Sequence, residues 1–207
     1  MGMRFGVDYY PEQWARERWQ SDLQRMKAMG FSVIRVMEFA WTLLEPEEGR
    51  YDFSLFDDFI SEAQSQKFQI ILGTPTATFP AWLYEKNPRI VQTHPDGSQE
   101  DFGTRRQACL NAPDYLEAAL KVVQAVGKHF GDNPTVTGWQ IDNEVGHEGS
   151  DHCVCPNCQE AWHRWLKKRY TTIDALNKAW GTVFWGTTYT KFYGMGVEAV
   201  QRNTNDG

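Results

Sequence analysis

The sequence predicts an α/β protein of the (β/α) TIM-type barrel class, of which this chain holds the first four to five βα units. Short runs rich in β-branched and aromatic residues alternate four times with longer segments whose apolar residues recur at helical spacing. This alternation is typical of parallel strands joined by helices. A doubly wound sheet is the alternative, but no glycine-rich phosphate loop follows the first strand, and this absence favours a barrel.

The first two units and the third strand follow from local patterns. Residues 3–7 predict a strand, and residues 14–29 predict a helix because their apolar side chains recur at helical spacing. The β-branched run 31–36 predicts the second strand. Ser54 is expected to be the N-cap of the next helix, and residues 68–72 predict the third strand.

The second part of the pattern adds two helices and a strand. Asn111 is expected to cap a helix that has Pro113 in its first turn. Residues 135–141 predict the fourth strand and residues 160–170 the fourth helix. The apolar stripe expected on the helix after Asn111 is Leu116, Leu120, Val123, Val126 and Phe130.

Chain length limits how much of a barrel is present. A complete eight-stranded barrel takes roughly 250 residues, whereas this chain has 207. We therefore expect residues 1–190 to be the N-terminal half of a (β/α)8 catalytic domain and residues 191–207 to be a tail without clear pattern. The chain would then be a fragment, a truncated gene product or a half-barrel that assembles with a partner. Open sheet edges would favour dimerisation or other self-association.

Composition and charge exclude several classes of protein. The formal net charge is −6 and no block of lysines and arginines is present, which argues against a nucleic-acid partner. No apolar run approaches the roughly 20 residues of a membrane helix. The N-terminus has no signal-peptide core, so a cytoplasmic protein is expected, although removal of a signal would leave the same start. The 9 Trp, 8 Tyr and 12 Phe lean weakly toward carbohydrate binding.

A carboxylic acid follows the fourth predicted strand. Glu144 ends the run GWQIDNE (138–144), directly after Asn143. Barrel enzymes carry catalytic groups at the C-terminal ends of their strands. Cleavage of a glycoside needs an acid that protonates the departing oxygen and a second carboxylate that attacks or stabilises the sugar cation. Glu144 is therefore the candidate general acid/base, and Asn143 is placed to hydrogen-bond a sugar hydroxyl beside it.

All four cysteines form one predicted constellation. Cys153, Cys155 and Cys158 have C-x-C-x2-C spacing, and Cys109 precedes them. Four thiolates suit tetrahedral Zn²⁺, and a site with four protein ligands is structural because it leaves no open position. The alternatives are two disulfides or free thiols; disulfides are rare in the cytosol, and the close spacing would strain them. His147 and His152 are spare ligands nearby.

Several motifs together carry a resemblance to a known family. They are DYYPEQ (8–13), RVMEFAW (35–41), GTR (103–105) and WQIDNEVG (139–146). With the cysteine cluster, they resemble glycoside hydrolase family 42, the β-galactosidases, which belong to a clan of (β/α)8 retaining glycosidases. The resemblance extends to about Thr190.

The resemblance implies roles for individual residues. Glu144 matches the acid/base and Asn143 its substrate-binding neighbour. Arg105 matches an arginine that hydrogen-bonds galactose, and Trp185 matches an aromatic residue near the pocket. The cysteines match a structural zinc site. The nucleophile, a glutamate after strand seven, has no matching position, and because a retaining mechanism needs its two carboxyls about 5–5.5 Å apart, the chain alone is expected to be inactive. Members of the family are often trimers.

Two other functions remain open from the sequence. The chain could be a non-catalytic half-barrel that binds galactosides or assembles with a partner chain. It could also be another glycosidase of the clan, such as a β-glucosidase or β-mannosidase, although Arg105 and the cysteine cluster favour family 42.

Other polar and aromatic residues have two interpretations. Glu38 and Asp8 follow predicted strands and could line the pocket, or Glu38 could pair with Arg35 beneath it. Trp41 and Trp82 could stack on sugars, but core packing or loop support is favoured. The remaining histidines are expected to be structural or on the surface: His94, His129 and His163.

Overall fold

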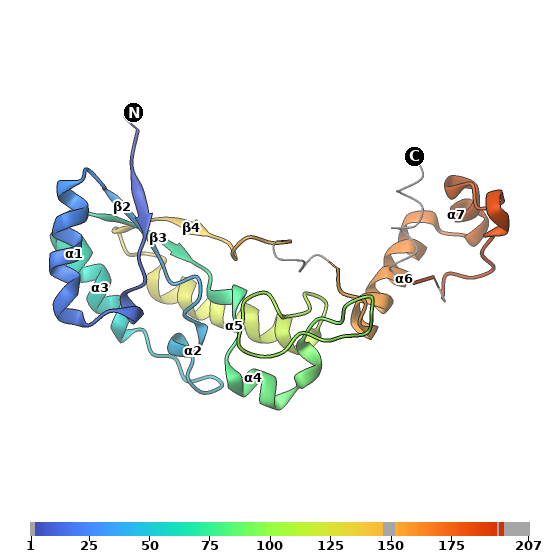
Figure 1. The fold of residues 1–207 in the computed structure, drawn as a ribbon, viewed down its shortest axis with the longest axis horizontal. Coiled ribbons are helices and arrows are strands. Elements are labelled where there is room, and N and C mark those ends of the chain that lie inside the picture. The colour runs from blue at the N-terminus through green and yellow to red at the C-terminus, as the bar shows by residue number, and fades with distance from the viewer. Residues whose placement is uncertain (1–2, 147–151, 194, 197–207) are drawn as a thin grey trace.

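The computed structural model describes residues 3–146, 152–193 and 195–196. Its centre is a parallel sheet with strand order β1-β2-β3-β4, so each connection joins neighbouring strands (Figure 1). The strands are β1 (Gly6–Asp8), β2 (Val33–Val36), β3 (Gln69–Gly73) and β4 (Val136–Gln140). The predicted succession of four parallel βα units is confirmed, although β1 begins at Gly6 rather than at residue 3.

Three long helices connect the strands: α1 (Arg16–Ala28), α3 (Ser54–Ser65) and α5 (Pro113–Phe130). The other helices are the short α2 (Trp41–Leu44) and α4 (Ala81–Lys86), and then α6 (Pro156–Tyr170) and α7 (Ile173–Trp180), which follow β4. The described 3-10 helices are Pro11–Gln13, Pro75–Ala77, Pro88–Ile90 and Phe184–Gly186. Among the described residues, no helix combines the length and the apolar character needed to span a lipid bilayer.

The main core lies between one face of the sheet and the long helices. In β2 and β3, Ile34 and Ile70 are fully buried, whereas the residues that precede them, Val33 and Gln69, are half-buried. The buried set shares one apolar cluster with side chains of α1, α3 and α5. Since helices form the outer layer of a (β/α) barrel, the half-buried face corresponds to the inside of the barrel.

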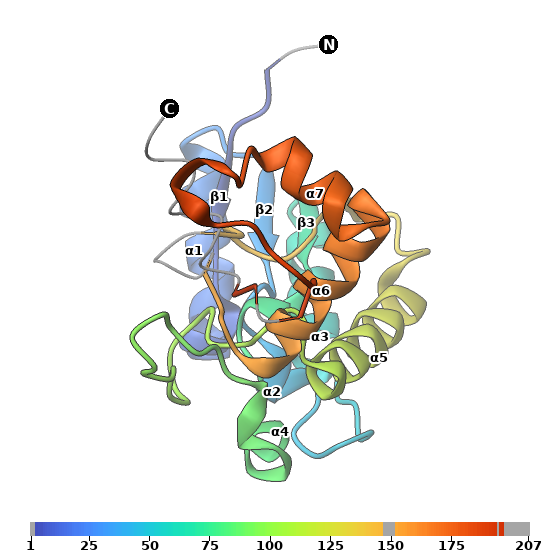
Figure 2. The ribbon, with the colours of Figure 1, turned by 90° about the vertical axis from the view of Figure 1, so that its right-hand side faces the viewer.

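Helices α6 and α7 lie apart from the sheet, at the far end of the molecule from α1 (Figures 1 and 2). They have a small core of their own, with Leu166, Leu176 and Met195 buried. The helix predicted at residues 160–170 is confirmed, but it begins earlier, at Pro156, and the short α7 was not expected. Helix α6 contacts the main core through the cysteines at its N-terminal end. Two of them, Cys155 and Cys158, are buried in the main apolar cluster.

Two predicted helix caps are wrong. Ser54 is the first residue of α3 rather than its N-cap, and its N–H donates to Asp52 Oδ1 at 3.0 Å. At α5 the N-cap is Ala112, without a side-chain hydrogen bond. The side chain of Asn111 instead donates from Nδ2 to Cys158 Sγ at 3.3 Å. A tertiary contact therefore replaces the local cap expected from the sequence.

The buried face of α5 is also rotated from the predicted stripe. Val126 and Phe130 are buried as expected, but Leu116 and Leu120 are 42% and 61% exposed. The positions one residue earlier are buried instead: Tyr115, Ala119 and Val122. Tyr115 and Ala119 are four positions apart, as are Leu116 and Leu120. The spacing of apolar residues alone therefore did not show which of these two faces of α5 is buried.

The two edges of the described sheet are open, because β1 and β4 each have one neighbouring strand. On and beside β4, Trp139 and Ile141 are 39% and 76% exposed. Exposed apolar edges pair readily with further chain segments or with other molecules, so self-association stays a prediction. The division into residues 1–190 and a tail at 191–207 also stays a prediction, since residues 197–207 lie outside the described part.

Gly73 allows the ends of β2 and β3 to approach closely. A methyl group at this position would lie 2.5 Å from Glu38 Cβ and 2.8 Å from its Cα. We expect Gly73→Ala to lower the free energy of unfolding by about 1–3 kcal/mol, as overpacking does, in urea denaturation followed by circular dichroism. The matched control is Gly127→Ala in α5, where an added methyl meets nothing within 4 Å and should be neutral or stabilising. Equal stability of the two variants would contradict this prediction.

Candidate active site

The candidate site lies just beyond the C-terminal end of β4, where Glu144 meets Arg105. Arg105 Nη1 lies 2.9 Å from Glu144 Oε2, and the two side chains are 35% and 49% exposed. Arg105 comes from the long connection between β3 and α5, 39 positions earlier in the sequence (144 − 105). The structure therefore brings together two residues that were singled out separately, in an ion pair open to solvent.

Asn143 is buried beside this ion pair, with 5% of its surface exposed. Its Oδ1 accepts a hydrogen bond from Gln140 Nε2 at 3.0 Å, and its Nδ2 donates to Glu144 Oε2 at 3.5 Å. Gln140 is itself held by Arg35, whose Nη1 donates to Gln140 Oε1 at 2.6 Å. The carboxamide is thus fixed from the sheet side and directed at the carboxyl group.

This arrangement suits chemistry on a sugar. The guanidinium and the carboxamide can hydrogen-bond hydroxyl groups, and the half-exposed carboxyl can exchange a proton with a bound glycosidic oxygen. The site has the right position for a barrel enzyme, at the C-terminal ends of the strands.

Glu38 and Asp8 pair with Arg35. Glu38 is fully buried, with Oε1 at 3.0 Å from Arg35 Nε and 2.9 Å from the hydroxyl of Tyr10, which donates to it. Arg35 Nη2 also donates to Asp8 Oδ2 at 2.7 Å. Burial, followed by the hydrogen bond to Glu38, raises the pKa of Tyr10 to about 12. The geometry favours the structural interpretation, a polar network that ties β1 to β2.

Two of the three tryptophans considered for the site, Trp41 and Trp82, also have structural contacts. Trp41 is fully buried and its Nε1 donates to Glu45 Oε2 at 2.8 Å, while Trp82 Nε1 donates to the Glu45 carbonyl at 2.9 Å. Core packing and loop support are therefore the roles that the structure shows. Trp185 falls in the 3-10 helix Phe184–Gly186, but its side chain lies outside the described part, so its place near the pocket stays a prediction.

The histidines have the structural or surface contacts expected of them. His94 pairs with Glu100, His129 stacks on Phe53 and pairs with Asp57, and His163 contacts the Met195 carbonyl.

The four cysteines converge in the structure and form a candidate metal centre. Their Sγ atoms all lie within 4.8 Å of one another, and Cys109 Sγ is 3.4 Å from both Cys155 Sγ and Cys158 Sγ. A tetrahedral zinc with Zn–S bonds of about 2.3 Å would space its sulfurs about 3.8 Å apart, so the donor set fits. None of the four forms a disulfide, which removes that alternative for this structure.

Hydrogen-bond donors surround the sulfurs. The Thr93 N–H donates to Cys153 Sγ at 3.4 Å, and the Asn111 N–H donates to Cys109 Sγ at the same distance. The hydrogen bond between Cys109 and Cys153 lowers the pKa of Cys153 and raises that of Cys109. The backbone N–H groups of Thr93 and Asn111 favour thiolate sulfur, the form that binds metal. Of the spare ligands, His147 lies outside the described residues, and His152 is not part of the cluster.

Sequence reasoning missed the residues that support the Asp142-Asn143-Glu144 turn. Arg106 Nη1 donates to Asp142 Oδ1 at 2.7 Å, and Thr76 Oγ1 donates to Asp142 Oδ2 at 2.8 Å. The available signal was position alone, since Asp142 directly precedes Asn143 and Arg106 directly follows Arg105.

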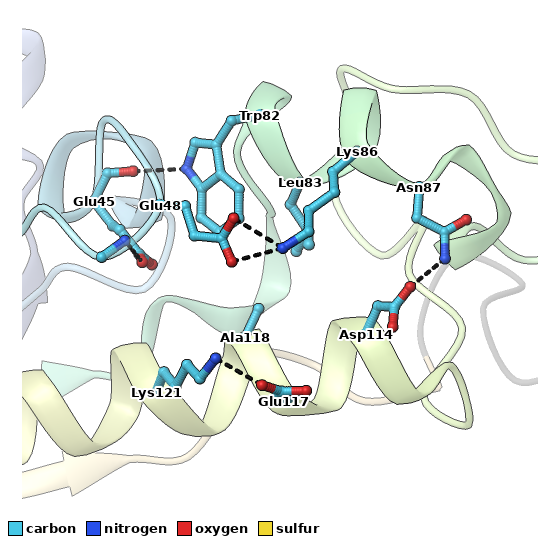
Figure 3. Close-up of a pocket in the computed structure, with 11 residues that line it drawn as sticks. Glu45, Glu48, Trp82, Leu83, Lys86, Asn87, Asp114, Glu117, Ala118 and Lys121 are labelled. Carbon is cyan, nitrogen blue, oxygen red and sulfur yellow. Dashed lines mark hydrogen bonds and ion pairs between the residues drawn. The ribbon is translucent and has the colours of Figure 1, made fainter.

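A cavity of about 160 Å³ between α4 and α5 is separate from this site (Figure 3). It is lined on one side by Trp82 and contains neither Arg105 nor Glu144. Lys86 pairs with Glu48, Lys121 pairs with Glu117 along α5, and the amide of Asn87 donates to Asp114 (Figure 3). The charged groups in these three contacts are therefore already paired, and the contacts do not point to a ligand.

Comparison with known proteins agrees with the geometry. The family model Glyco_hydro_42, described as Beta-galactosidase, matches residues 8–197. β-Galactosidase BgaA of Thermus sp is 45% identical over 187 residues, which cover 90% of this chain and 29% of that protein. The chain thus spans less than a third of the length of this relative.

Solved structures show the same relationship. The β-galactosidase of the Antarctic haloarchaeon Halorubrum lacusprofundi is 42% identical, with a TM-score of 0.88 over 92% of this chain and 28% of that one. The β-galactosidase of the psychrophilic Marinomonas ef1 is 37% identical, with a TM-score of 0.87 over 92% of this chain and 29% of that one. The chain belongs to glycoside hydrolase family 42, the β-galactosidase family, and its four βα units form part of an α/β barrel.

Proposed function

We propose that this chain supplies the acid/base half of a retaining β-galactosidase that hydrolyses terminal β-D-galactosides. The observation that carries the proposal is the Arg105–Glu144 pair, 2.9 Å apart at the end of β4, in a chain of the β-galactosidase family. Because the chain spans less than a third of its relatives, the activity of a whole enzyme is part of the proposal.

In the proposed reaction, Glu144 gives a proton to the glycosidic oxygen while a second carboxylate attacks the anomeric carbon. The bond to the leaving alcohol breaks, and a covalent glycosyl intermediate forms. Glu144, now a carboxylate, then takes a proton from the water that releases the sugar. The nucleophile is proposed to come from a later strand of the family barrel, about 5–5.5 Å from Glu144. The chain alone should therefore leave a chromogenic galactoside intact.

Substrate binding is assigned to Arg105, Asn143 and Trp185. Arg105 is 35% exposed and pairs with Glu144, whereas Asn143 is held by Gln140. This combination suits a sugar that bridges the two groups through its hydroxyls.

Replacing Arg105 by alanine tests this assignment on the chain itself. We expect the Kd for galactose to rise about ten- to a hundredfold, since a hydrogen bond to a charged group contributes about 1.5–3 kcal/mol. The measurement is an NMR titration of the wild-type and variant chains. The matched control is Arg164→Ala, which removes an exposed arginine paired with Glu160 on α6. Unchanged galactose affinity in Arg105→Ala would show that this arginine does not bind the sugar.

The cysteine cluster is proposed to hold one structural Zn²⁺ per chain. Support comes from four sulfurs within 4.8 Å of one another and from the N–H groups directed at them. Cys109 precedes α5, in the connection that also carries Arg105. Cys153 and Cys155 lie between β4 and α6, and Cys158 lies in the first turn of α6. A bound ion would hold together the connection that carries Arg105 and the connection that carries Glu144. Four unpaired thiols also suit a reducing compartment such as the cytoplasm.

The second candidate function is a galactoside-binding half-barrel without catalysis. The open edge of β4, with Trp139 and Ile141 exposed, favours assembly with another chain segment or a second copy. Galactose binding without turnover, retained after the chain is joined to the later strands of a family barrel, would support this function over the first.

A further inference from the structure

We propose that Arg106 and Asp142 form a buried clamp that positions Asn143 and the acid/base Glu144, with Arg106 as a positioning residue for proton transfer. The inference rests on the proposed function of Glu144. The clamp itself is a geometric feature that can be tested separately.

Consecutive arginines point in different directions at the site. Arg105 is half-exposed and contacts Glu144, whereas the side chain of Arg106 is 7% exposed and contacts Asp142. Arg106 has a φ of +72°, in the left-handed region that residues other than glycine rarely adopt. Its backbone N–H donates to the Ala77 carbonyl at 2.9 Å. The backbone is thus anchored while the guanidinium is turned inward.

Asp142 receives contacts from both neighbouring connections. Besides Arg106 and Thr76, its Oδ1 accepts the N–H of Asn143 at 2.5 Å. Its own N–H donates to Thr74 Oγ1 at 2.7 Å, and its carbonyl accepts from Gln140 Nε2 at 2.9 Å. Every polar group of Asp142 therefore has a partner from β3, β4 or the connections that follow them.

The clamp holds a strained turn. Asp142 has a φ of +57° and Glu144 a φ of +48°. Such conformations persist when the surrounding contacts over-determine them, and they gather at functional sites. Rotation of Asp142 would turn the backbone of Asn143 and swing Glu144 away from Arg105, because the three residues are contiguous.

Stability alone does not explain a buried arginine here. Arg106 Nε and Nη2 are buried without a hydrogen-bond partner among the described residues. A buried ion pair with unsatisfied donors contributes little net stability, and an apolar pair of similar volume is often as good. The pair is better explained by the geometry it imposes. Helix α5 supports it, because the Tyr115 hydroxyl donates to the Thr76 carbonyl at 2.7 Å.

The clamp is tested on the chain itself by amide hydrogen exchange of Asn143, measured by NMR. We expect Arg106→Met to speed exchange of this amide about tenfold or more, as expected when a hydrogen bond to a charged acceptor is weakened. Arg106→Lys, which keeps the charge, should restore part of the protection. Arg164→Met, on the exposed face of α6, is the control and should leave Asn143 unchanged. An Asn143 amide that exchanges at the wild-type rate in Arg106→Met overturns the proposal.

A second variant decides the question if Arg106→Met does not fold. Thr76→Val keeps the side-chain shape and removes the donor to Asp142 Oδ2. It should also speed exchange of the Asn143 amide, and an unchanged rate would overturn the clamp. Failure of the wild-type chain to bind galactose would instead count against the proposed function, while Asn143 exchange still decides the clamp.

The positioning role is tested separately by kinetics, in this chain joined to the later part of the Thermus sp β-galactosidase. Arg106→Met should lower kcat/KM at least tenfold more for lactose, whose leaving group needs a proton, than for 2,4-dinitrophenyl galactoside, whose leaving group does not. An equal loss for both substrates would mean that Arg106 only maintains the fold, and would overturn the positioning role.

Discussion

Replacing Cys109 by serine is expected to abolish zinc binding and to release α6 and α7 from the rest of the molecule. Cys109 is fully buried in the main core, and its sulfur touches those of Cys155 and Cys158. Helices α6 and α7 have only a small core of their own. Loss of a structural metal is among the few changes that lower the free energy of unfolding by more than about 4 kcal/mol.

Elemental analysis, thermal unfolding and limited proteolysis near Pro156 would measure this effect. The purified wild-type chain should contain one zinc per molecule. Asn111→Ala is the matched control, because it removes a hydrogen bond to Cys158 but no ligand, and it should weaken zinc binding about 10- to 100-fold without abolishing it. A wild-type chain that lacks zinc while all four thiols titrate freely would contradict the zinc site.

Glu144→Gln is expected to lower kcat/KM for lactose by about 10²–10⁴, the usual contribution of general acid/base catalysis. The amide keeps the size of the side chain but has no proton to donate to the leaving oxygen. Turnover of substrates with poor leaving groups should fall first, and that of an activated aryl galactoside should fall less. The experiment uses this chain joined to the later part of the Thermus sp relative, to which it is 45% identical.

Glu160→Gln serves as the control for this change, since Glu160 is an exposed carboxylate on α6 that pairs with Arg164. It should leave lactose hydrolysis as it was. If the Glu144→Gln fusion hydrolyses lactose at the unchanged rate, Glu144 is not the acid/base. A fusion without activity that still binds galactose would favour the non-catalytic half-barrel.

Much of the fold was predictable because it depends on local pattern. The β-branched runs and helical apolar spacing lie within short segments, so the four parallel βα units could be read in order. The wrong predictions concern positions where a tertiary contact replaced the arrangement that the local sequence favoured. Asn111 contacts Cys158 instead of capping α5, and the leucines of α5 face solvent because Tyr115, Ala119 and Val122 are buried in their place.

The sequence by itself determined the chemical groups of the site. Glu144 and Asn143 stand directly after a strand, and three of the four cysteines lie within six positions (153–158). Adjacent residues at a strand end must share a location, whatever the rest of the chain does. The placement of Asn143 and Glu144 therefore needed only the position of β4.

Only the tertiary structure decided which distant segments meet. Arg105 reaches Glu144, Cys109 joins the other cysteines, and Arg106 turns inward to Asp142, in each case from the connection between β3 and α5. These contacts depend on the parallel pairing of β3 with β4, which brings the connections after both strands to the same edge of the sheet. Local pattern carries no information on side-chain direction across such a gap, and the left-handed backbone of Arg106 and Asp142 is set by the surrounding hydrogen bonds.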